Sequence, residues 1–366
     1  MSGLATRTVV FAGGGSAGHV EPALAVARAW REKYPHDRCI FLGTPLGLEN
    51  TLVPAAGFEL CNIEKVVMPR KLNFDIVKLP MQLFRAVNSA KKFINQADLL
   101  IGFGGYLSAS AYLAAWLARV PMVVHEANAK AGWANRLGAL LTKNLAVARP
   151  FAAGSFTRAT ITGLPLRSDV RAAYLAALQD WQGTRRRAKK TLGWKIDQPA
   201  LLVLGGSQGS TFINTQIARA LPSLSSKGIQ ILHSVGANNK LPPNFEEYKA
   251  VPYIEDMATA YLAADVVLAR SGAVTCAEVG ALGRMAIFVP LPIGNGEQAR
   301  NADHLVEIGR AIVIAQKDFS SQWLIEQIDA AIEQGRQNSE PDTSQDLEAE
   351  ARIVALMENA LQGNSR

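Results

Sequence analysis

Short apolar segments alternate with stretches of helical periodicity along the whole chain. The first half contains six predicted strands, at residues 8–12, 39–42, 99–101, 122–125, 145–148 and 159–162. The second half contains six more, at residues 200–204, 230–234, 250–252, 266–269, 286–289 and 311–314. Strands that alternate with helices through short connections predict parallel sheets built from right-handed crossovers. The pattern therefore predicts an α/β protein.

Two similar open sheets explain the pattern better than one large sheet. Residues 97–105 resemble residues 264–272, and each segment is followed by one predicted helix and another apolar strand. Gly163-Leu164-Pro165 breaks both helix and strand, so we place the join there. The predicted organisation is a first domain at 1–163, a second domain at 164–340, and a helix with a tail at 341–366. Beyond the join, residues 184–190 form a basic stretch that we expect to be solvated.

A glycine-rich turn follows a strand in each half, at residues 13–18 and 205–209. Such turns direct backbone N–H groups and a helix N-terminus toward an anion. Gly13, Gly15 and Gly18 also satisfy the GxGxxG pattern of dinucleotide-binding dehydrogenases, but the next strand ends in Gly43-Thr44 without the acidic residue that holds a ribose. Neither turn contains the GK[ST] of a phosphate-binding loop. The turns therefore favour nucleotide-type binding without hydride or ATP chemistry.

Two titratable residues stand out in the predicted helices. His19 lies near a helix N-terminus, where positive potential lowers the pKa and favours the neutral, basic form. It is a candidate general base, with a capping or packing histidine as the alternative. Glu278 lies within an apolar stripe, where an unpaired carboxylate is costly to bury. It is a candidate for two ribose hydroxyls, with a structural salt bridge as the alternative.

Composition adds a charge pattern to this picture. The 366 residues carry a net charge of +7, and three cysteines without metal-ligand spacing are typical of a reducing compartment. We expect no membrane-spanning segment and no export signal. Residues 65–92 hold seven basic residues and one acidic residue beside many apolar ones. This basic and apolar segment predicts contact with anionic lipid, with an ordinary solvated helix as the alternative.

Several linked motifs resemble the MurG family, bacterial UDP-N-acetylglucosamine:N-acetylmuramyl-(pentapeptide) pyrophosphoryl-undecaprenol N-acetylglucosaminyltransferases. The motifs are GGGSAGHVEPALAVA from Gly13, GFGGYLS from Gly102, HEAN from His125, GLPLR from Gly163, GGSQGS from Gly205, and RSGAVTCAE to GNGEQARNA between Arg270 and Ala302. The family's commoner GGTGGH and HEQN are GGGSAGH and HEAN here. The resemblance implies a GT-B fold, in which two Rossmann-like domains with parallel sheets face a cleft. It also implies that the first domain binds the lipid acceptor and that the second domain binds most of the donor.

The resemblance also implies roles for individual residues. Ser16, Ala17 and Gly18 match the loop near the donor's phosphates and sugar. Asn128 matches the sugar contact, Arg167 the phosphate contact and Ser207 the serine beside the diphosphate. Ile254 matches the residue whose backbone reads uracil. Val274, Thr275 and Glu278 match the ribose-binding turn, and Gln298 matches a sugar-hydroxyl contact.

The implied reaction is an inverting transfer of N-acetylglucosamine from UDP-GlcNAc to the muramyl 4-hydroxyl of an undecaprenyl-pyrophosphoryl-linked pentapeptide, a step of peptidoglycan synthesis. We expect His19, or alternatively Glu126, to be the base. We expect no cofactor, no structural metal and no nucleic-acid partner, and a peripheral location on the cytoplasmic face of the bacterial cell membrane. A UDP-GlcNAc 2-epimerase and a non-catalytic nucleotide-sugar binder remain the alternatives.

Overall fold

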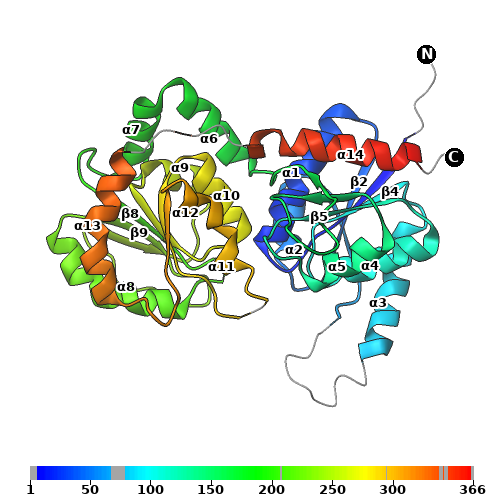
Figure 1. Cartoon of the computed structure of the whole chain (residues 1–366), viewed down its shortest axis with the longest axis horizontal. Coiled ribbons are helices and arrows are strands. Elements are labelled where there is room, and N and C mark those ends of the chain that lie inside the picture. The colour runs from blue at the N-terminus through cyan, green and yellow to red at the C-terminus, as the bar shows by residue number, and fades with distance from the viewer. Residues whose placement is uncertain are drawn as a thin grey trace. The chain divides into compact units, whose positions relative to one another are not determined.

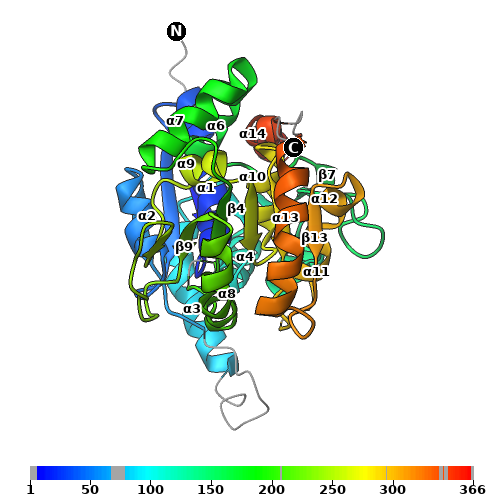
Figure 2. The same cartoon turned by 90° about the vertical axis from the view of Figure 1, so that its left-hand side faces the viewer.

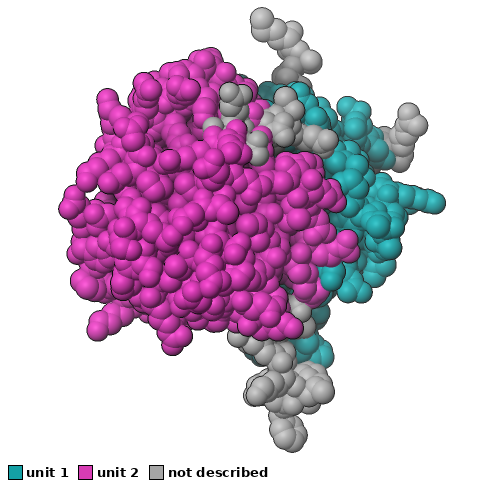
Figure 3. Space-filling model, turned by 60° about the vertical axis from the view of Figure 1, so that its left-hand side comes forward, with its two compact units in different colours: residues 1–166, 345–366 teal, residues 167–344 magenta. Residues whose placement is uncertain are grey.

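A computed structural model describes residues 6–66, 79–206, 208–293, 295–337, 341 and 345–363. The chain forms two compact units, coloured separately in Figure 3. Unit 1 comprises residues 1–166 and 345–366, and unit 2 comprises residues 167–344. The division falls three residues after the predicted join, and the C-terminal helix returns to unit 1.

Unit 1 contains a seven-stranded sheet in the order β3-β2-β1-β4-β5-β6-β7, with parallel pairing throughout (Figure 1). Its strands are β1 (Thr8–Ala12), β2 (Arg38–Gly43), β3 (Glu59–Asn62), β4 (Leu99–Gly102), β5 (Met122–Glu126), β6 (Leu145–Val147) and β7 (Thr160–Ile161). Its helices are α1 (Ala17–Lys33), α2 (Glu49–Ala55), α3 (Leu79–Ile94), α4 (Tyr106–Ala118), α5 (Trp133–Leu141) and α14 (Ala349–Gly363). A 3-10 turn, Gln345–Glu348, precedes α14.

Alternate residues of these strands supply two separate cores, one on each face of the sheet. Val9 and Phe11 pack with α1 and α14, whereas Val10 and Ala12 pack with α3 and α4. Asp346 fixes the returning segment, because its buried carboxylate accepts hydrogen bonds from the Leu164 amide at 2.8 Å and from the Arg149 guanidinium at 2.7 and 2.8 Å.

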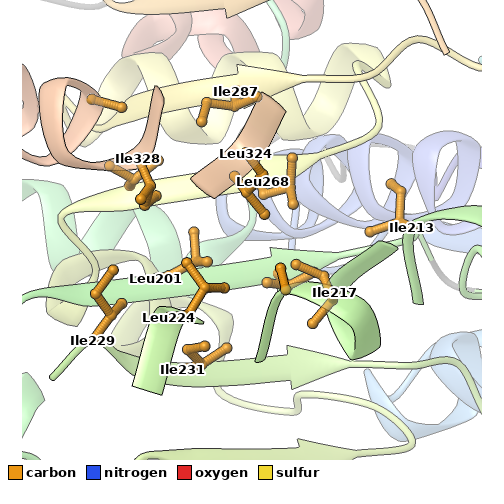
Figure 4. Packing of buried hydrophobic residues seen from close by; sticks show 14 of the residues in the cluster. Leu201, Ile213, Ile217, Leu224, Ile229, Ile231, Leu268, Ile287, Leu324 and Ile328 are labelled. Atoms are coloured by element: carbon orange, nitrogen blue, oxygen red, sulfur yellow. The ribbon is translucent and has the colours of Figure 1, made fainter. Parts of the chain in front are cut away.

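Unit 2 contains a six-stranded parallel sheet in the order β10-β9-β8-β11-β12-β13. Its strands are β8 (Ala200–Leu204), β9 (Gln230–Ser234), β10 (Tyr248–Val251), β11 (Val266–Ala269), β12 (Met285–Phe288) and β13 (Ala311–Val313). Its helices are α6 (Ser168–Gln179), α7 (Trp181–Thr191), α8 (Thr211–Ser226), α9 (Met257–Ala263), α10 (Ala273–Ala281), α11 (Gln298–Asn301), α12 (Asp303–Glu307) and α13 (Ser321–Gln337). Helices α8 and α13 lie side by side on one face of the sheet (Figure 2). Ile217, Leu224 and Ile328 pack there against Leu201 and Leu268 (Figure 4).

All twelve predicted strands are present with ends within two residues of the prediction, and the predicted α/β class is confirmed. Strand β3 was not predicted. Among the described residues, no helix is both long and apolar enough to cross a membrane.

The expectation of a solvated basic stretch at residues 184–190 is only partly right. Arg186, Arg187 and Lys190 are exposed, but Thr184, Ala188 and Lys189 are buried. These residues belong to α7, where Lys189 is 2% exposed and donates hydrogen bonds to the carbonyls of Ile196 and Gln198. Burial lowers the pKa of Lys189 to about 8, although nearby Asp265 acts in the opposite direction. Arg185, on the same helix, pairs with Asp265, which is completely buried.

Candidate active site

The loops after β1 and β4 meet where the strand order of unit 1 reverses. Strand β1 lies between β2 and β4, and the chain leaves β1 and β4 for helices on opposite faces of the sheet. Open α/β sheets bind ligands at this switch point, beyond the carboxyl ends of the strands. The first glycine turn and His19 lie in the loop after β1 and the first turn of α1.

His19 is held by its own turn. Its Nδ1 lies 3.1 Å from Ser16 Oγ and 3.3 Å from the carbonyl oxygen of Gly14. Because a carbonyl oxygen only accepts hydrogen bonds, we assign the imidazole proton to Nδ1, with Nε2 as the unprotonated nitrogen. Ser16 is the N-cap residue, and Ala17 and Gly18 are the first, half-buried residues of α1.

Two glycines after β4 leave room for the imidazole of His19. A Cβ on Gly104 would lie 3.4 Å from Nε2, and a Cβ on Gly105 would lie 2.8 Å from the carbonyl oxygen of Gly14. Both glycines also have positive φ angles, of 95° and 84°, which side chains rarely adopt. The GFGGYLS motif therefore shapes the space around His19.

Burial lowers the pKa of His19 below its usual value, and the negative charges of Glu126 and Glu49 and the Gly14 carbonyl act in the opposite direction. The neutral imidazole is the form that can accept a proton. The lowered pKa favours the neutral imidazole, and the ring lies beyond the carboxyl ends of the strands, where open α/β sheets bind ligands.

Glu126 ends β5 and is 2% exposed. Its carboxylate accepts hydrogen bonds from the backbone and side-chain amides of Asn128 at 2.9 and 3.0 Å, from the Gly132 amide at 2.9 Å and from Asn135 Nδ2 at 3.0 Å. Tyr112 in turn donates to Asn135 Oδ1 at 2.8 Å. Glu126 therefore organises the loop that carries Asn128.

Glu49 is a residue that the sequence prediction missed. It begins α2 and is 1% exposed, and its carboxylate reaches back to accept hydrogen bonds from the amides of Gly15 and Thr44, each at 3.0 Å. An acidic side chain thus does lie beside the end of β2, five residues beyond Thr44. The signal that could have found it is a carboxylate at the first position of a short helix after an apolar strand.

In unit 2, Arg270 connects the loops at the carboxyl ends of four strands. Its guanidinium donates to the carbonyl oxygens of Val289 at 2.9 Å and Pro290 at 3.2 Å, to Ser210 Oγ at 2.9 Å and to Gln316 Oε1 at 2.7 Å. Burial lowers the pKa of Arg270, which is 8% exposed. The sequence prediction used Arg270 only as part of a motif, and an arginine directly after an apolar strand was the available signal.

The second glycine turn packs against the neighbouring loop. A Cβ on Gly209 would lie 2.0 Å from the carbonyl oxygen of Val235, and Gly209 also has a φ of 73°. Ser210 then caps α8 by accepting a hydrogen bond from the Ile213 amide at 3.3 Å. Ser207 lies outside the described residues.

Glu278 is on α10 and is 3% exposed, and it accepts a hydrogen bond from the Tyr261 hydroxyl at 3.0 Å. Burial and the Glu278 charge raise the pKa of Tyr261, so this phenol stays a donor. Val274 and Thr275 lie half-buried in the first turn of the same helix. The apolar stripe of α10 thus carries the Glu278 carboxylate on the same helix as Val274 and Thr275, which match the ribose-binding turn.

Arg167 precedes α6 and pairs bidentately with Asp169 at 3.1 and 3.2 Å. Its positive charge acts to lower the pKa of Tyr261, the phenol that donates to Glu278. Ile254 is 7% exposed in the segment between β10 and α9.

Gln298 begins α11, and its side-chain oxygen accepts from the Leu291 amide at 3.0 Å. Its carbonyl accepts from Ser271 Oγ at 2.8 Å, which joins the loops after β11 and β12. Within the parts of the chain that the structure describes, no group of three or more His, Cys, Asp or Glu side chains is placed to hold a metal ion.

The chain matches two family models. The Glycosyltransferase family 28 N-terminal domain matches residues 9–147, and the Glycosyltransferase family 28 C-terminal domain matches residues 200–357. The second match extends beyond unit 2 into α14, which belongs to unit 1.

Two curated relatives cover most of the chain. Both are described as UDP-N-acetylglucosamine--N-acetylmuramyl-(pentapeptide) pyrophosphoryl-undecaprenol N-acetylglucosamine transferases. The protein from Paenarthrobacter aurescens is 45% identical over 87% of this chain and 85% of its own length, and that from Corynebacterium glutamicum strain R is 47% identical over 87% of each. The crystal structure of MurG from Acinetobacter baumannii is 27% identical, with a TM-score of 0.68 over 97% of this chain and 99% of that one.

Proposed function

The chain belongs to the MurG family, the UDP-N-acetylglucosamine--N-acetylmuramyl-(pentapeptide) pyrophosphoryl-undecaprenol N-acetylglucosamine transferases, and on this premise we propose how its two units divide the reaction. It is a UDP-GlcNAc-dependent glycosyltransferase that acts on a lipid-linked muramyl-pentapeptide acceptor. Unit 2 binds the donor through the loops around Arg270 and Glu278. Unit 1 receives the acceptor and supplies the base.

The base is His19, and the observation that carries this assignment is the position of its Nδ1 against the Gly14 carbonyl. With Nδ1 protonated, Nε2 can take the proton of the muramyl 4-hydroxyl as that oxygen bonds to the anomeric carbon of UDP-GlcNAc. The glycosidic electron pair leaves with UDP, so a single displacement inverts the anomeric centre. Glu126 is less suited to this role, because four hydrogen bonds already occupy its oxygens.

The leaving diphosphate gains negative charge in the transition state. Arg167, Ser207 and the N-terminus of α8 supply positive charge, a hydroxyl and a favourable helix dipole for it. Asn128 and Gln298 contact sugar hydroxyls, the Ile254 backbone reads uracil, and Ser16 to Gly18 line the donor's sugar and phosphates. This chemistry needs no resident metal.

One assay distinguishes the alternatives. Purified protein is incubated with UDP-GlcNAc, with and without a lipid-linked muramyl-pentapeptide. Release of UDP that depends on the acceptor supports the transferase. Epimerised sugar without acceptor would indicate an epimerase, and binding without turnover would indicate a nucleotide-sugar binder.

Replacing Glu278 with glutamine should weaken UDP binding by about 1–3 kcal/mol, because the amide presents a donor where the ribose needs an acceptor. Calorimetric titration of UDP measures the effect. Glu326→Gln on α13 is the matched control, since this carboxylate is exposed and accepts a hydrogen bond from Gln322 on the same helix. Parental affinity in a folded Glu278→Gln protein would remove Glu278 from the ribose site.

We propose that α3 brings unit 1 to the cytoplasmic face of the membrane, where the polyprenyl chain of the acceptor is anchored. Ala86, Val87 and Ala90 on this helix are buried, whereas Met81 and Phe84 are 57% and 62% exposed. Exposed apolar side chains beside Arg85, Lys91 and Lys92 suit an anionic lipid surface. Lys71 and Lys78, which extend the same basic pattern, lie outside the described residues.

Removing four basic residues of this segment should abolish salt-sensitive sedimentation with anionic vesicles while UDP binding persists. Each contributes about 1 kcal/mol near such a surface. The variant changes to glutamine Lys71, Lys78, Arg85 and Lys92. The control removes the same charge from exposed positions of unit 2, namely Arg186, Arg187, Lys190 and Lys240. Equal sedimentation of the first variant and the parent would place the membrane contact elsewhere.

A further inference from the structure

A single peptide group joins the buried carboxylate of Glu49 to the imidazole of His19. The carbonyl oxygen of Gly14 lies 3.3 Å from His19 Nδ1, and the N–H of Gly15, on the other side of the same peptide bond, donates to Glu49 Oε2 at 3.0 Å. The two side chains come from the first turn of α1 and the first residue of α2.

The first glycine turn is built around this carboxylate. A Cβ on Gly14 would lie 3.1 Å from Glu49 Oε1, and a Cβ on Gly47 would lie 2.0 Å from it. Thr44 holds the same oxygen through its amide at 3.0 Å and its hydroxyl at 3.1 Å. The Gly15 N–H, which an anion-binding turn would offer to a ligand, therefore serves a side chain of the protein itself.

The arrangement has a chemical consequence for the imidazole. A peptide whose N–H donates to a carboxylate is polarised, and its carbonyl becomes a stronger acceptor. A stronger acceptor at Gly14 stabilises the tautomer with the proton on Nδ1. It also stabilises the imidazolium that forms when Nε2 takes a second proton.

We propose that Glu49 is a positioning residue for His19, acting through the Gly14–Gly15 peptide to fix the Nδ1–H tautomer and the ring orientation. The role resembles that of the acid in a catalytic triad, with a peptide group inserted between acid and imidazole. The charged groups that act on the imidazole are Glu49 from α2 and Glu126 from the end of β5. The Glu126 carboxylate is engaged by the loop of Asn128.

This inference rests on the proposed role of His19 as the base, yet part of it can be measured without turnover. Protein labelled with ¹⁵N-histidine reports the tautomer and the pKa of each imidazole by NMR, and His19→Gln identifies the His19 signals. The parent is expected to show Nδ1–H. Glu49→Gln is expected to lower the pKa of His19 and to populate the Nε2–H tautomer, because the amide removes the charge and presents a donor toward one of the N–H groups.

The same variant should lower kcat by roughly 10–100-fold, a loss typical of residues that orient a reacting group, with the KM for UDP-GlcNAc within about twofold of the parent. The acidic limb of the pH profile of kcat/KM should move to lower pH together with the pKa of His19. Glu59→Gln is the control, because it makes the same change at a carboxylate that is 43% exposed and paired with Arg38. It should leave the NMR signals of His19 and the kinetics unchanged.

The outcomes separate this inference from the proposed function. An Nε2–H tautomer in the parent overturns the inference without any variant, and so does a folded Glu49→Gln protein with parental tautomer and pKa at His19. If the NMR changes occur but His19→Ala turns over normally, the link between Glu49 and His19 stands and the assignment of the base fails.

Discussion

Replacing His19 with alanine is expected to lower turnover by about 10²–10⁴-fold while UDP binds with nearly parental affinity. The loss follows from removing the group that accepts the proton of the attacking hydroxyl. Because the neutral form is active, the parent should lose kcat/KM as the pH falls through the pKa of His19, which burial holds below its usual value. The alanine variant should lack this acidic limb. Steady-state kinetics across pH, together with calorimetric titration of UDP, measure both effects.

His36→Ala is the control for this experiment, since His36 is exposed in the loop after α1 of the same unit. It should retain parental turnover and the acidic limb. Turnover of the His19 variant within a few-fold of the parent would assign the base to another group, with Glu126 tested next.

The strands could be predicted because parallel sheets covered on both faces need continuous apolar segments. Residues 200–204 and 266–269 are completely or almost completely buried, and their predicted bounds were right. Strand β3 escaped prediction because it lies at the edge of its sheet, where Glu59 and Asn62 are exposed and only part of Leu60 is covered. An edge strand needs less apolar surface, so the pattern carries little signal.

The two glycine turns show the limit of local pattern. Both follow an apolar strand and precede a helix, and the sequence assigned both the same capacity for anions. In the structure the first turn differs, because its Gly15 amide donates to the carboxylate of Glu49. That contact depends on where the first residue of α2 lies, which the local pattern does not show. Arg270 is similar, since its partners at Ser210 and Gln316 are distant in sequence. Contacts between loops that follow different strands depend on tertiary packing, so the local sequence pattern does not predict them.

Carboxylates with similar burial have different surroundings in this protein. Glu126 accepts from amides of the loop that follows it and from Asn135 on α5. Glu278 accepts from a neutral phenol, and Asp265 lies among guanidinium and ammonium groups. A buried charge is tolerated when its surroundings satisfy it, and the kind of partner indicates its use. The neutral partner of Glu278 is compatible with a role in ligand binding. The cations around Asp265 favour a structural role.

Replacing Asp265 with asparagine is therefore expected to destabilise unit 2 by about 3–5 kcal/mol, the cost of removing one partner from a buried ion pair. Asp265 is fully buried, accepts from the Ala200 amide at 2.8 Å, and pairs with Arg185, Lys189 and Arg336. Asparagine can keep the Ala200 contact, but it leaves Lys189, which is 2% exposed, without a compensating charge. Hydrogen exchange of peptides from β8 and β11, followed with increasing urea, reports the free energy of unfolding of unit 2 by itself.

Asp329→Asn makes the same change in an ion pair with Lys227 in which the aspartate is 63% exposed. It should cost no more than about 1 kcal/mol, since exposed pairs contribute little to stability. The test compares the losses of stability in the two variants. Both remove one carboxylate charge from unit 2, but water can solvate the remaining cation only at the exposed Asp329 pair. Equal, small effects would mean that water or rearranged partners satisfy the Asp265 cluster. The docking of α7 would then depend on Ala188 and the stacking of Arg284 on Trp181, whose ring centroid lies 4.1 Å from the guanidinium, instead of on charge.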